Sequence, residues 1–182
     1  MTIEVLAKQG NGVHHGTMAE SILTRVYDLR KKVIQDSFQN FQQQEHRLEF
    51  VAKIRGVEFI NDSMACNINS AWYALENMHN PTIWIVGGQM KDAHFDMLKP
   101  LVKKKVKAII CLGVDNTPLI DAFAEIIPNF IQTRSAQEAV ERAYLMAQEG
   151  DTVLLSPACP SFDLFESFED RGIQFKLAVN EL

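Results

Sequence analysis

Two short apolar runs place the strongest constraint on the fold of this chain. Thr82–Val86 reads TIWIV and Ala108–Leu112 reads AIICL, without the polar alternation of a half-exposed strand. Strands covered on both faces have this pattern. Segments with apolar residues at helical spacing accompany them, at Ile68–Met78 and Phe95–Lys105. The alternation predicts a three-layer α/β fold with an open, mostly parallel sheet.

The rest of the second half of the chain continues this alternation. Phe50–Ile54 and Val57–Ile60 flank Arg55-Gly56, which predicts a β-hairpin with a tight turn. Further strands are predicted at 130–131 and 152–155, and further helices at 119–125, 136–148 and 168–180. Ligands of such sheets bind at the carboxyl ends of the strands, so the loops there are the candidate sites.

The first 44 residues are organised differently. We expect a strand at Thr2–Ala7, a glycine-rich loop at 10–16, and two helices at Met18–Lys32 and Val33–Phe41. The glutamine-rich stretch Gln39–Gln44 predicts a boundary between a domain at 1–44 and a domain at 45–182. The loop is also typical of dinucleotide binding, but a second helix follows where that fold needs a second strand.

Composition excludes several classes of protein. Hydrophobic residues make up 47% and charged residues 23% of the chain, as in ordinary soluble domains. The net charge of −5 gives no electrostatic basis for binding nucleic acid or an anionic membrane surface. No apolar run reaches the ~18 residues of a membrane span, and no secretion signal is evident. The widely spaced Cys66, Cys111 and Cys159 favour neither a zinc site nor a disulfide framework and predict a cytoplasmic protein.

Three loops at predicted strand ends carry polar side chains. They cover residues 61–67, 87–91 and 156–161, and in a parallel sheet they lie at one edge. Together they offer Asp62, the hydroxyl groups of Ser63 and Ser161, and the cation of Lys91. We also expect a helix to begin near Ser161 and to point backbone N–H groups at the same place, a geometry that suits an anion. Each loop alone has a simpler interpretation, as a helix cap, a turn or a solvated lysine.

Longer strings in these loops resemble a known family. Ser156–Ser161 with Phe168, Arg171 and Gly172 is similar to the motif SPACASxDxF…FExRG of the Mur ligase C-terminal domain. His46–Glu49 is similar to the family's EHRLE, residues 57–67 to VxFINDSKATN, and residues 84–91 to WIxGGxDK. The resemblance covers residues 46–182 and is strongest to the ligases that add D-glutamate in peptidoglycan synthesis.

The resemblance implies a Rossmann-like fold and specific site residues. In the family, the matching residues that bind D-glutamate are Lys91, Ser161, Phe162, Phe168 and Cys66. The matching residues that approach the nucleotide are Arg47 and Asp62. The resemblance assigns no catalytic residue and no metal ligand to this chain.

The resemblance also implies a reaction. The family uses ATP and Mg²⁺ to activate the carboxylate of UDP-N-acetylmuramoyl-L-alanine, which the amine of D-glutamate then attacks. Residues 1–44 resemble the tail of the family's central ATPase domain. The phosphate-binding loop G-x-x-x-x-G-K-[ST] occurs nowhere in this chain. We therefore expect ATP and Mg²⁺ to be bound mainly by a domain outside it, central and N-terminal domains to be its partners, and the isolated chain to be inactive.

Four residues depart from the family pattern. Met64 replaces a lysine, Cys66 a threonine, Met90 an acidic residue and Pro160 an alanine. The first two changes remove a cation and a good hydrogen-bonding hydroxyl from the expected D-glutamate site. They leave an alternative open, in which the chain is a non-catalytic α/β binding module that has diverged from a Mur ligase.

Overall fold

The computed structural model describes residues 15–38, 44–90 and 95–182. The chain divides into two units, Met1–Asn40 and Phe41–Leu182, and each is described by itself. The predicted boundary at 44/45 lies close to this division. The predicted strand at Thr2–Ala7 and most of the glycine-rich loop lie outside the described residues.

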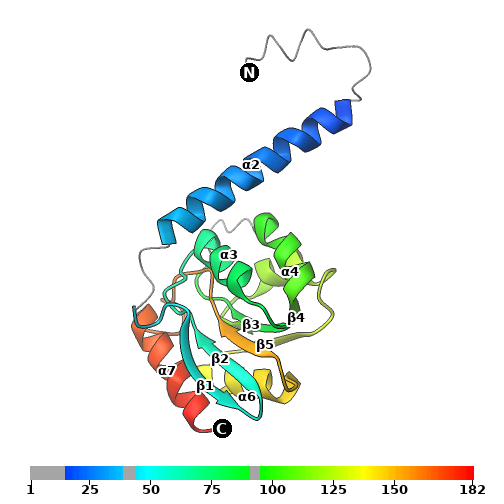
Figure 1. The fold of residues 1–182 in the computed structure, drawn as a ribbon. Helices are drawn as coiled ribbons and strands as arrows, with labels where there is room; N and C mark the ends of the chain where they lie inside the picture. Colours follow the sequence, from blue (N-terminus) through cyan, green and yellow to red (C-terminus); the bar gives the residue numbers. More distant parts are fainter. Residues whose placement is uncertain (1–14, 39–43, 91–94) are drawn as a thin grey trace. The chain divides into compact units, whose positions relative to one another are not determined.

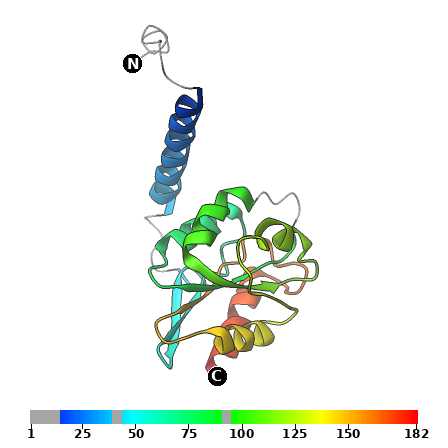
Figure 2. The ribbon, with the colours of Figure 1, turned by 90° about the vertical axis from the view of Figure 1, so that its right-hand side faces the viewer.

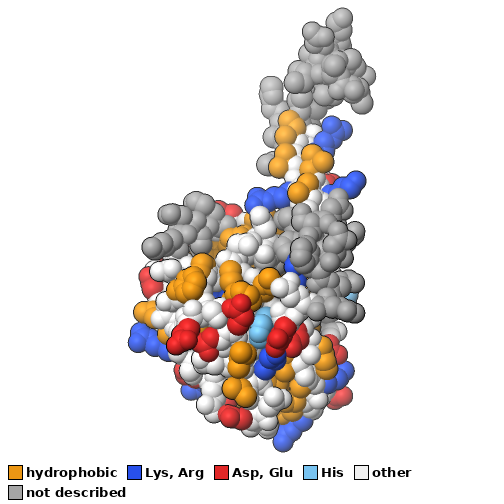
Figure 3. All heavy atoms as spheres, turned by 90° about the vertical axis from the view of Figure 1, so that its left-hand side faces the viewer, with side chains coloured by type: hydrophobic (Ala, Val, Ile, Leu, Met, Phe, Trp, Pro, Cys, Tyr) orange, Lys and Arg blue, Asp and Glu red, His pale blue; other side chains and the backbone are white. Residues whose placement is uncertain are grey.

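The first unit contains one long helix, α2 (His15–Phe38). The prediction of two helices was wrong, because no glycine or proline interrupts the pattern at residues 32–33 and apolar residues continue at helical spacing. Large apolar side chains on this helix are strongly exposed: Ile22 (54%), Val26 (57%), Leu29 (66%) and Val33 (63%). Figure 3 shows a row of hydrophobic side chains along the helix with Lys and Arg side chains beside it.

The second unit is built on one six-stranded sheet with the order β1-β2-β6-β3-β4-β5. Its strands are β1 (Glu49–Ile54), β2 (Val57–Asn61), β3 (Thr82–Val86), β4 (Val106–Leu112), β5 (Phe130–Thr133) and β6 (Thr152–Leu155). β1 pairs antiparallel with β2, and the other strands pair in parallel. The predicted α/β class and mostly parallel sheet are confirmed.

Helices cover both faces of this sheet (Figures 1 and 2). On one face lie α6 (Ala136–Met146) and α7 (Phe168–Asn180), and on the other lie α3 (Ile68–Asn77), η1 (Phe95–Leu98), α4 (Lys99–Lys105) and α5 (Thr117–Phe123). Every residue of β3 and of β6 is buried, as the apolar runs predict for strands between two helical layers. The α6–α7 side of the core includes Phe59, Ile83, Ile110, Val153 and Phe175.

The helix predicted to begin near Ser161 is absent from the described structure of that segment. The Ser161 carbonyl accepts hydrogen bonds from Leu164 N (3.2 Å) and Phe165 N (3.0 Å), which close a single turn. The helix α7 begins at Phe168, and Ser167 is its N-cap, accepting a hydrogen bond from Asp170 N. Ser161 therefore lies in a loop, and the expectation of a helix N-terminus beside it was wrong.

Candidate functional site

The loops after β2, β3 and β6 contact one another directly. Ala158 N donates to the carbonyl of Ala65 (2.8 Å), and Gln89 N donates to the carbonyl of Pro160 (2.9 Å). The turn after β6 thus lies between the loops that follow β2 and β3. The predicted convergence of these loops at one edge is confirmed, whereas the ligand that they bind stays a prediction.

Gly88 makes this close approach possible. Its φ of +137° lies in a region that residues with side chains rarely adopt. A Cβ at this position would overlap the carbonyl oxygen of Pro160 and lie 3.3 Å from the Cβ of Cys159. A glycine at position 88 is therefore required for the contact between the β3 and β6 loops.

Arg171, on the first turn of α7, binds two of these loops, those after β2 and β6. Its side chain is 1% exposed. It donates from Nε to Ser63 Oγ (2.9 Å) and from Nη2 to Ser63 O (2.8 Å). Nη1 donates to the carbonyl of Cys159 (3.2 Å), and Nη2 lies 3.4 Å from Cys66 Sγ. One guanidinium therefore links the loop after β2 to the loop after β6.

Gly172 has a separate role on the same helix turn. A Cβ there would overlap the imidazole of His46, which is 4% exposed. His46 Nδ1 lies 2.9 Å from Asn61 Nδ2, so the ring accepts that hydrogen bond through Nδ1. The Arg171-Gly172 pair thus positions both the loops of the predicted pocket and the segment that carries Arg47.

Asp62 is a buried carboxyl group at the end of β2. Its Oδ1 accepts a hydrogen bond from Leu48 N (3.1 Å), and its Oδ2 accepts one from Ser156 Oγ (2.9 Å). Burial raises the pKa of Asp62 to about 7, against the opposing effect of these hydrogen bonds and of Arg47 and Arg171. Both oxygens already have partners within the chain, so Asp62 connects the segment containing Arg47 to the β6 loop.

The other predicted site residues differ in exposure. Ser161 is 2% exposed, and Phe162, beside it, is 69% exposed. Phe168 is the first residue of α7, and its carbonyl accepts a hydrogen bond from Ser63 Oγ (2.7 Å). Cys66 is half-buried beside Arg171. Lys91 lies outside the described residues. The structure therefore brings Ser161, Phe168 and Cys66 into one cluster of loops.

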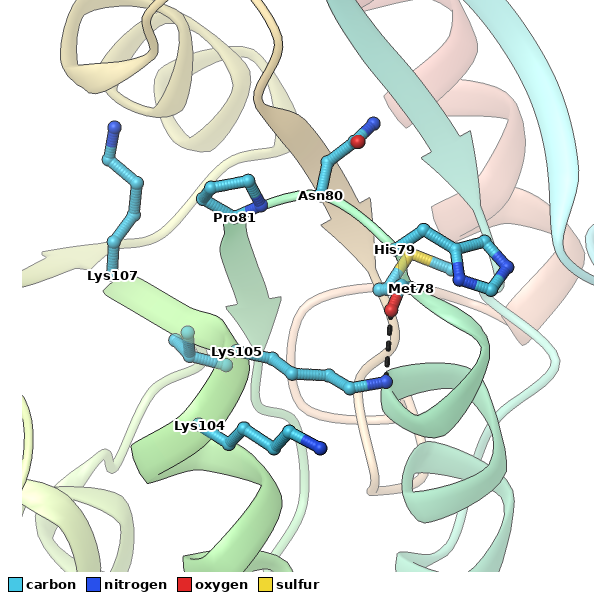
Figure 4. Close-up of a pocket in the computed structure, with 8 residues that line it drawn as sticks. Met78, His79, Asn80, Pro81, Lys104, Lys105 and Lys107 are labelled. Atoms are coloured by element: carbon cyan, nitrogen blue, oxygen red, sulfur yellow. Dashed lines mark hydrogen bonds between the residues drawn. The ribbon is translucent and has the colours of Figure 1, made fainter.

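A cavity of about 370 Å³ lies at the opposite edge of the sheet, at the amino ends of β3 and β4. Its lining includes Lys104, Lys105 and Lys107. Lys105 reaches the carboxyl end of α3 and donates to the carbonyls of Leu75 (3.0 Å), Glu76 (2.6 Å) and Met78 (2.9 Å), as Figure 4 shows for the last of these. Lys107 points away in that view and pairs with Asp151 Oδ2 (2.6 Å). The cavity therefore lies at the opposite end of the strands from the loops that are predicted to bind the ligand.

A protein-family model described as "Mur ligase, glutamate ligase domain" matches residues 46–159, more than half of the chain. The chain belongs to the Mur ligase family. The match contains the loops after β2 and β3 and the first four residues of the loop after β6, 156–159. The family prediction is therefore confirmed.

Two curated relatives of this Mur ligase chain carry the same name. This chain is 51% identical to the UDP-N-acetylmuramoylalanine–D-glutamate ligase of Christiangramia forsetii, in an alignment that covers all of this chain and 41% of that protein. It is 45% identical to the ligase of the same name from Porphyromonas gingivalis, over all of this chain and 40% of that protein. The chain thus spans about two fifths of the length of these relatives.

Solved structures share the fold at low sequence identity. The bifunctional folylpolyglutamate synthase/dihydrofolate synthase of Yersinia pestis matches with a TM-score of 0.54 and 16% identity, over 78% of this chain and 32% of that chain. The UDP-N-acetylmuramate-alanine ligase of Thermotoga maritima matches with a TM-score of 0.52 and 10% identity, over 80% of this chain and 32% of that chain. These likenesses support the fold of this Mur ligase domain.

Proposed function

We propose that this chain is the C-terminal, amino-acid-positioning part of an ATP-dependent ligase that adds D-glutamate to UDP-N-acetylmuramoyl-L-alanine. The observation that carries the proposal is the direct contact between the loops after β2, β3 and β6. By resemblance to the family motifs, we assign the D-glutamate residues to these loops and to the start of α7. The common name of relatives at 45–51% identity supports the choice of D-glutamate and of the UDP-linked acceptor.

The chain's part in this reaction is positioning. In the whole ligase, ATP transfers a phosphoryl group to the acceptor carboxylate, and the D-glutamate amine displaces phosphate from the acyl phosphate to form the amide. We assign the D-glutamate carboxylates to Lys91 and Ser161. We assign the walls of the pocket to Phe162, Phe168 and Cys66. We assign Arg47 and Asp62 to the nucleotide side of the site. Correct orientation of an amine against an acyl phosphate lowers the barrier by making the attack effectively unimolecular.

The remaining parts of such a ligase would lie in other domains. A solved relative with a TM-score of 0.51, the Yersinia pestis folylpolyglutamate synthase, was determined with AMPPNP and a manganese ion. This supports ATP and Mg²⁺ for the proposed ligase. Across residues 15–38, 44–90 and 95–182, no group of three His, Cys, Asp or Glu side chains is arranged for a metal ion, so we assign no Mg²⁺ ligand there. We assign the proposed enzyme to the cytoplasm, where ATP is available to it.

Residues 1–44 are proposed to be the end of the central ATPase domain. In the apolar row on α2, the side chains of residues such as Val26 and Leu29 are each more than half exposed. A helix that packs against a larger domain has such a face. The central and N-terminal domains are accordingly the proposed partners of this chain. In the described part of the chain, no helix combines the length and the apolar character that crossing a bilayer requires.

Two contacts favour the alternative of a non-catalytic binding module. Cys66 Sγ lies 3.6 Å from the Ser63 carbonyl and 3.4 Å from Arg171 Nη2, so it is engaged within the chain. Met64 supplies no cation where the family has a lysine. If the pocket has diverged, restoring the family residues would not create affinity for D-glutamate.

Titration calorimetry with D-glutamate tests the proposed pocket. The double variant Met64→Lys, Cys66→Thr is expected to bind at least about a hundredfold more tightly than the unchanged chain, since it restores two polar contacts worth ~1–3 kcal/mol each. Lys91→Ala is expected to weaken binding. Lys104→Ala, at the opposite edge of the sheet, is the matched control and should change nothing. Equal affinity in all four proteins would contradict the pocket and favour the alternative.

An activity measurement tests the role of the missing phosphate-binding loop. With ATP, Mg²⁺, UDP-N-acetylmuramoyl-L-alanine and D-glutamate, the chain alone is expected to release no phosphate above the rate of a heat-denatured sample. Sustained phosphate release by the pure chain would show that the chain itself activates the carboxylate, against the proposal.

A further inference from the structure

Arg171 is a buried cation whose hydrogen-bond partners are all uncharged groups or a thiol. Its acceptors are the hydroxyl and carbonyl of Ser63, the carbonyl of Cys159 and the sulfur of Cys66. Within residues 15–38, 44–90 and 95–182, no carboxylate oxygen lies at ion-pair distance from its guanidinium. Buried charges in proteins are normally paired, because removing a charge from water is costly.

Two acidic groups interact with Arg171 electrostatically from further away. Asp62 is one of them, and burial raises its pKa to about 7, so it is only partly ionised at neutral pH. Asp163 is the other, and its Oδ2 accepts a hydrogen bond from Val114 N (3.0 Å). Neither carboxylate forms a hydrogen-bonded pair with the guanidinium. The positive charge of Arg171 is thus left without a close counter-charge in this part of the structure.

The position of this charge relates it to the predicted amino-acid pocket. Cys66 Sγ contacts the guanidinium directly. Ser63 Oγ accepts from Arg171 Nε and donates to the carbonyl of Phe168, so Phe168 belongs to the same hydrogen-bond chain. Ser161 follows two residues after Cys159, whose carbonyl Arg171 holds. The guanidinium of Arg171 is therefore linked, directly or through neighbouring residues, to three of the residues assigned to D-glutamate.

We propose that Arg171 is a specificity-determining residue, whose uncompensated charge favours an amino acid with an anionic side chain while its hydrogen bonds fix the two loops of the pocket. This inference rests on the proposed function, because it assumes that the pocket takes D-glutamate. It assigns Arg171 no direct contact with the ligand. A charge acting through a poorly solvated interior is screened much less than a charge at the surface.

The test compares the affinities for D-glutamate and D-glutamine, which differ in side-chain charge and are nearly isosteric. NMR titrations of the ¹⁵N-labelled chain at constant ionic strength measure both. Arg171→Met, which removes the charge, is expected to reduce the preference for D-glutamate about tenfold. Arg171→Lys, which retains the charge without the planar fork, should keep most of that preference. Arg142→Met, at an exposed position on α6, is the matched control and should leave the preference unchanged.

The outcomes separate a charge effect from a structural one. If Arg171→Met weakens both ligands equally, the residue only braces the loops and the proposal is wrong. If the unchanged chain binds neither ligand, the proposed function fails and this inference fails with it. If Arg171→Met does not give a folded spectrum, the preference of the unchanged chain for D-glutamate over D-glutamine is measured between about 0.05 and about 0.5 M salt. A preference carried by buried Arg171 persists over that range, whereas a preference that collapses with salt belongs to a surface cation.

Discussion

Buried and half-buried cations have different partners at the two ends of the parallel strands. The amino edge is the side of the sheet where these strands begin, and the carboxyl edge is the side where they end. At the amino edge, Lys105 donates to carbonyls at the end of α3, and Lys107 is paired with Asp151. At the carboxyl edge, Arg171 joins two loops and has no carboxylate at ion-pair distance among the described residues. The charges of the amino edge are thus paired or bound within the fold, whereas we propose that the buried charge of Arg171 at the carboxyl edge acts on a ligand without touching it.

The cavity and the motif residues lie at different edges. The cavity of about 370 Å³ is at the amino edge. The family motifs and the contacts between loops are at the carboxyl edge, where ligands of open parallel sheets bind. With the site proposed at the carboxyl edge, the partners of buried charges and the convergence of loops would indicate its position, and the volume of a cavity would not.

The largest difference in stability between the two edges should come from replacing one glycine at each edge by alanine. Gly88→Ala introduces a Cβ that overlaps the Pro160 carbonyl at a φ of +137°, and we expect a loss of about 3–5 kcal/mol in the free energy of unfolding. Gly150→Ala, before β6 at the amino edge, also has positive φ (+91°) but has no atom within 4 Å of the added Cβ. Its expected cost is about 1 kcal/mol, from backbone strain alone. Urea unfolding measures both, and equal costs would contradict the close loop contact at Gly88.

Two buried aspartates provide the next comparison. Asp62 has a pKa raised to about 7, so between about pH 4 and pH 7 the folded chain binds a proton that the unfolded chain has released. Its contribution to stability is therefore favourable at low pH and is lost as the pH rises towards 7. Asp62→Asn should be about 2 kcal/mol more stable than the unchanged chain at pH 8, with a smaller difference at pH 5.

Asp151 is the matched control for that substitution. It forms an ion pair with Lys107 (2.6 Å) and accepts a hydrogen bond from Gln148 N (2.6 Å). Asp151→Asn should therefore destabilise the fold at pH 8, by about 1–3 kcal/mol. Chemical denaturation at the two pH values measures both variants. If Asp62→Asn were destabilising at pH 8 as well, the account of Asp62 as a carboxyl group whose ionised form is disfavoured by burial would be wrong.

A smaller effect is expected from the lysines that line the amino-edge cavity. Lys105→Met removes the hydrogen bonds to the Leu75, Glu76 and Met78 carbonyls and should cost about 1–2 kcal/mol of stability. Lys104→Met, at an exposed position on α4, should cost nothing measurable. Neither should alter D-glutamate affinity by calorimetry. A loss of affinity in either variant would move the site to the amino edge.

The smallest effect on the α/β unit is expected from α2. Val26→Glu places a charge in the middle of the apolar row on this helix, which belongs to the other unit of the chain. Hydrogen-exchange rates of the β3 and β6 amides should remain unchanged, because those strands are buried within the second unit. Faster exchange throughout the sheet would indicate that the stability of the two units is coupled.

Sequence reasoning predicted the parts of this fold that depend on local patterns. The apolar runs at Thr82–Val86 and Thr152–Leu155 became fully buried parallel strands, and strand order then brought their following loops together. The two errors in secondary structure were also local. Helix α2 continues through residues 32–33, and Ser167, not Ser161, caps the helix that contains Arg171.

The role of Arg171 could not be predicted from the sequence. Its contacts with Ser63 span 108 positions, and nothing in the pattern of either segment states that a guanidinium fills the space between them. Gly172 is similar, because its lack of a side chain is explained only by the imidazole of His46 packed against it. The family motif marked both residues, but only the three-dimensional contacts give the physical reason.

The central claim is that the carboxyl edge of the sheet is an amino-acid pocket, and an NMR titration of the ¹⁵N-labelled chain with D-glutamate tests it most directly. Chemical-shift changes are expected at residues 61–67, 86–90 and 156–168, with none at residues 78–81 and 104–107 and with weaker effects from L-glutamate at equal ionic strength. Changes confined to the amino-edge cavity, or identical responses to both enantiomers over the whole surface, would contradict the claim.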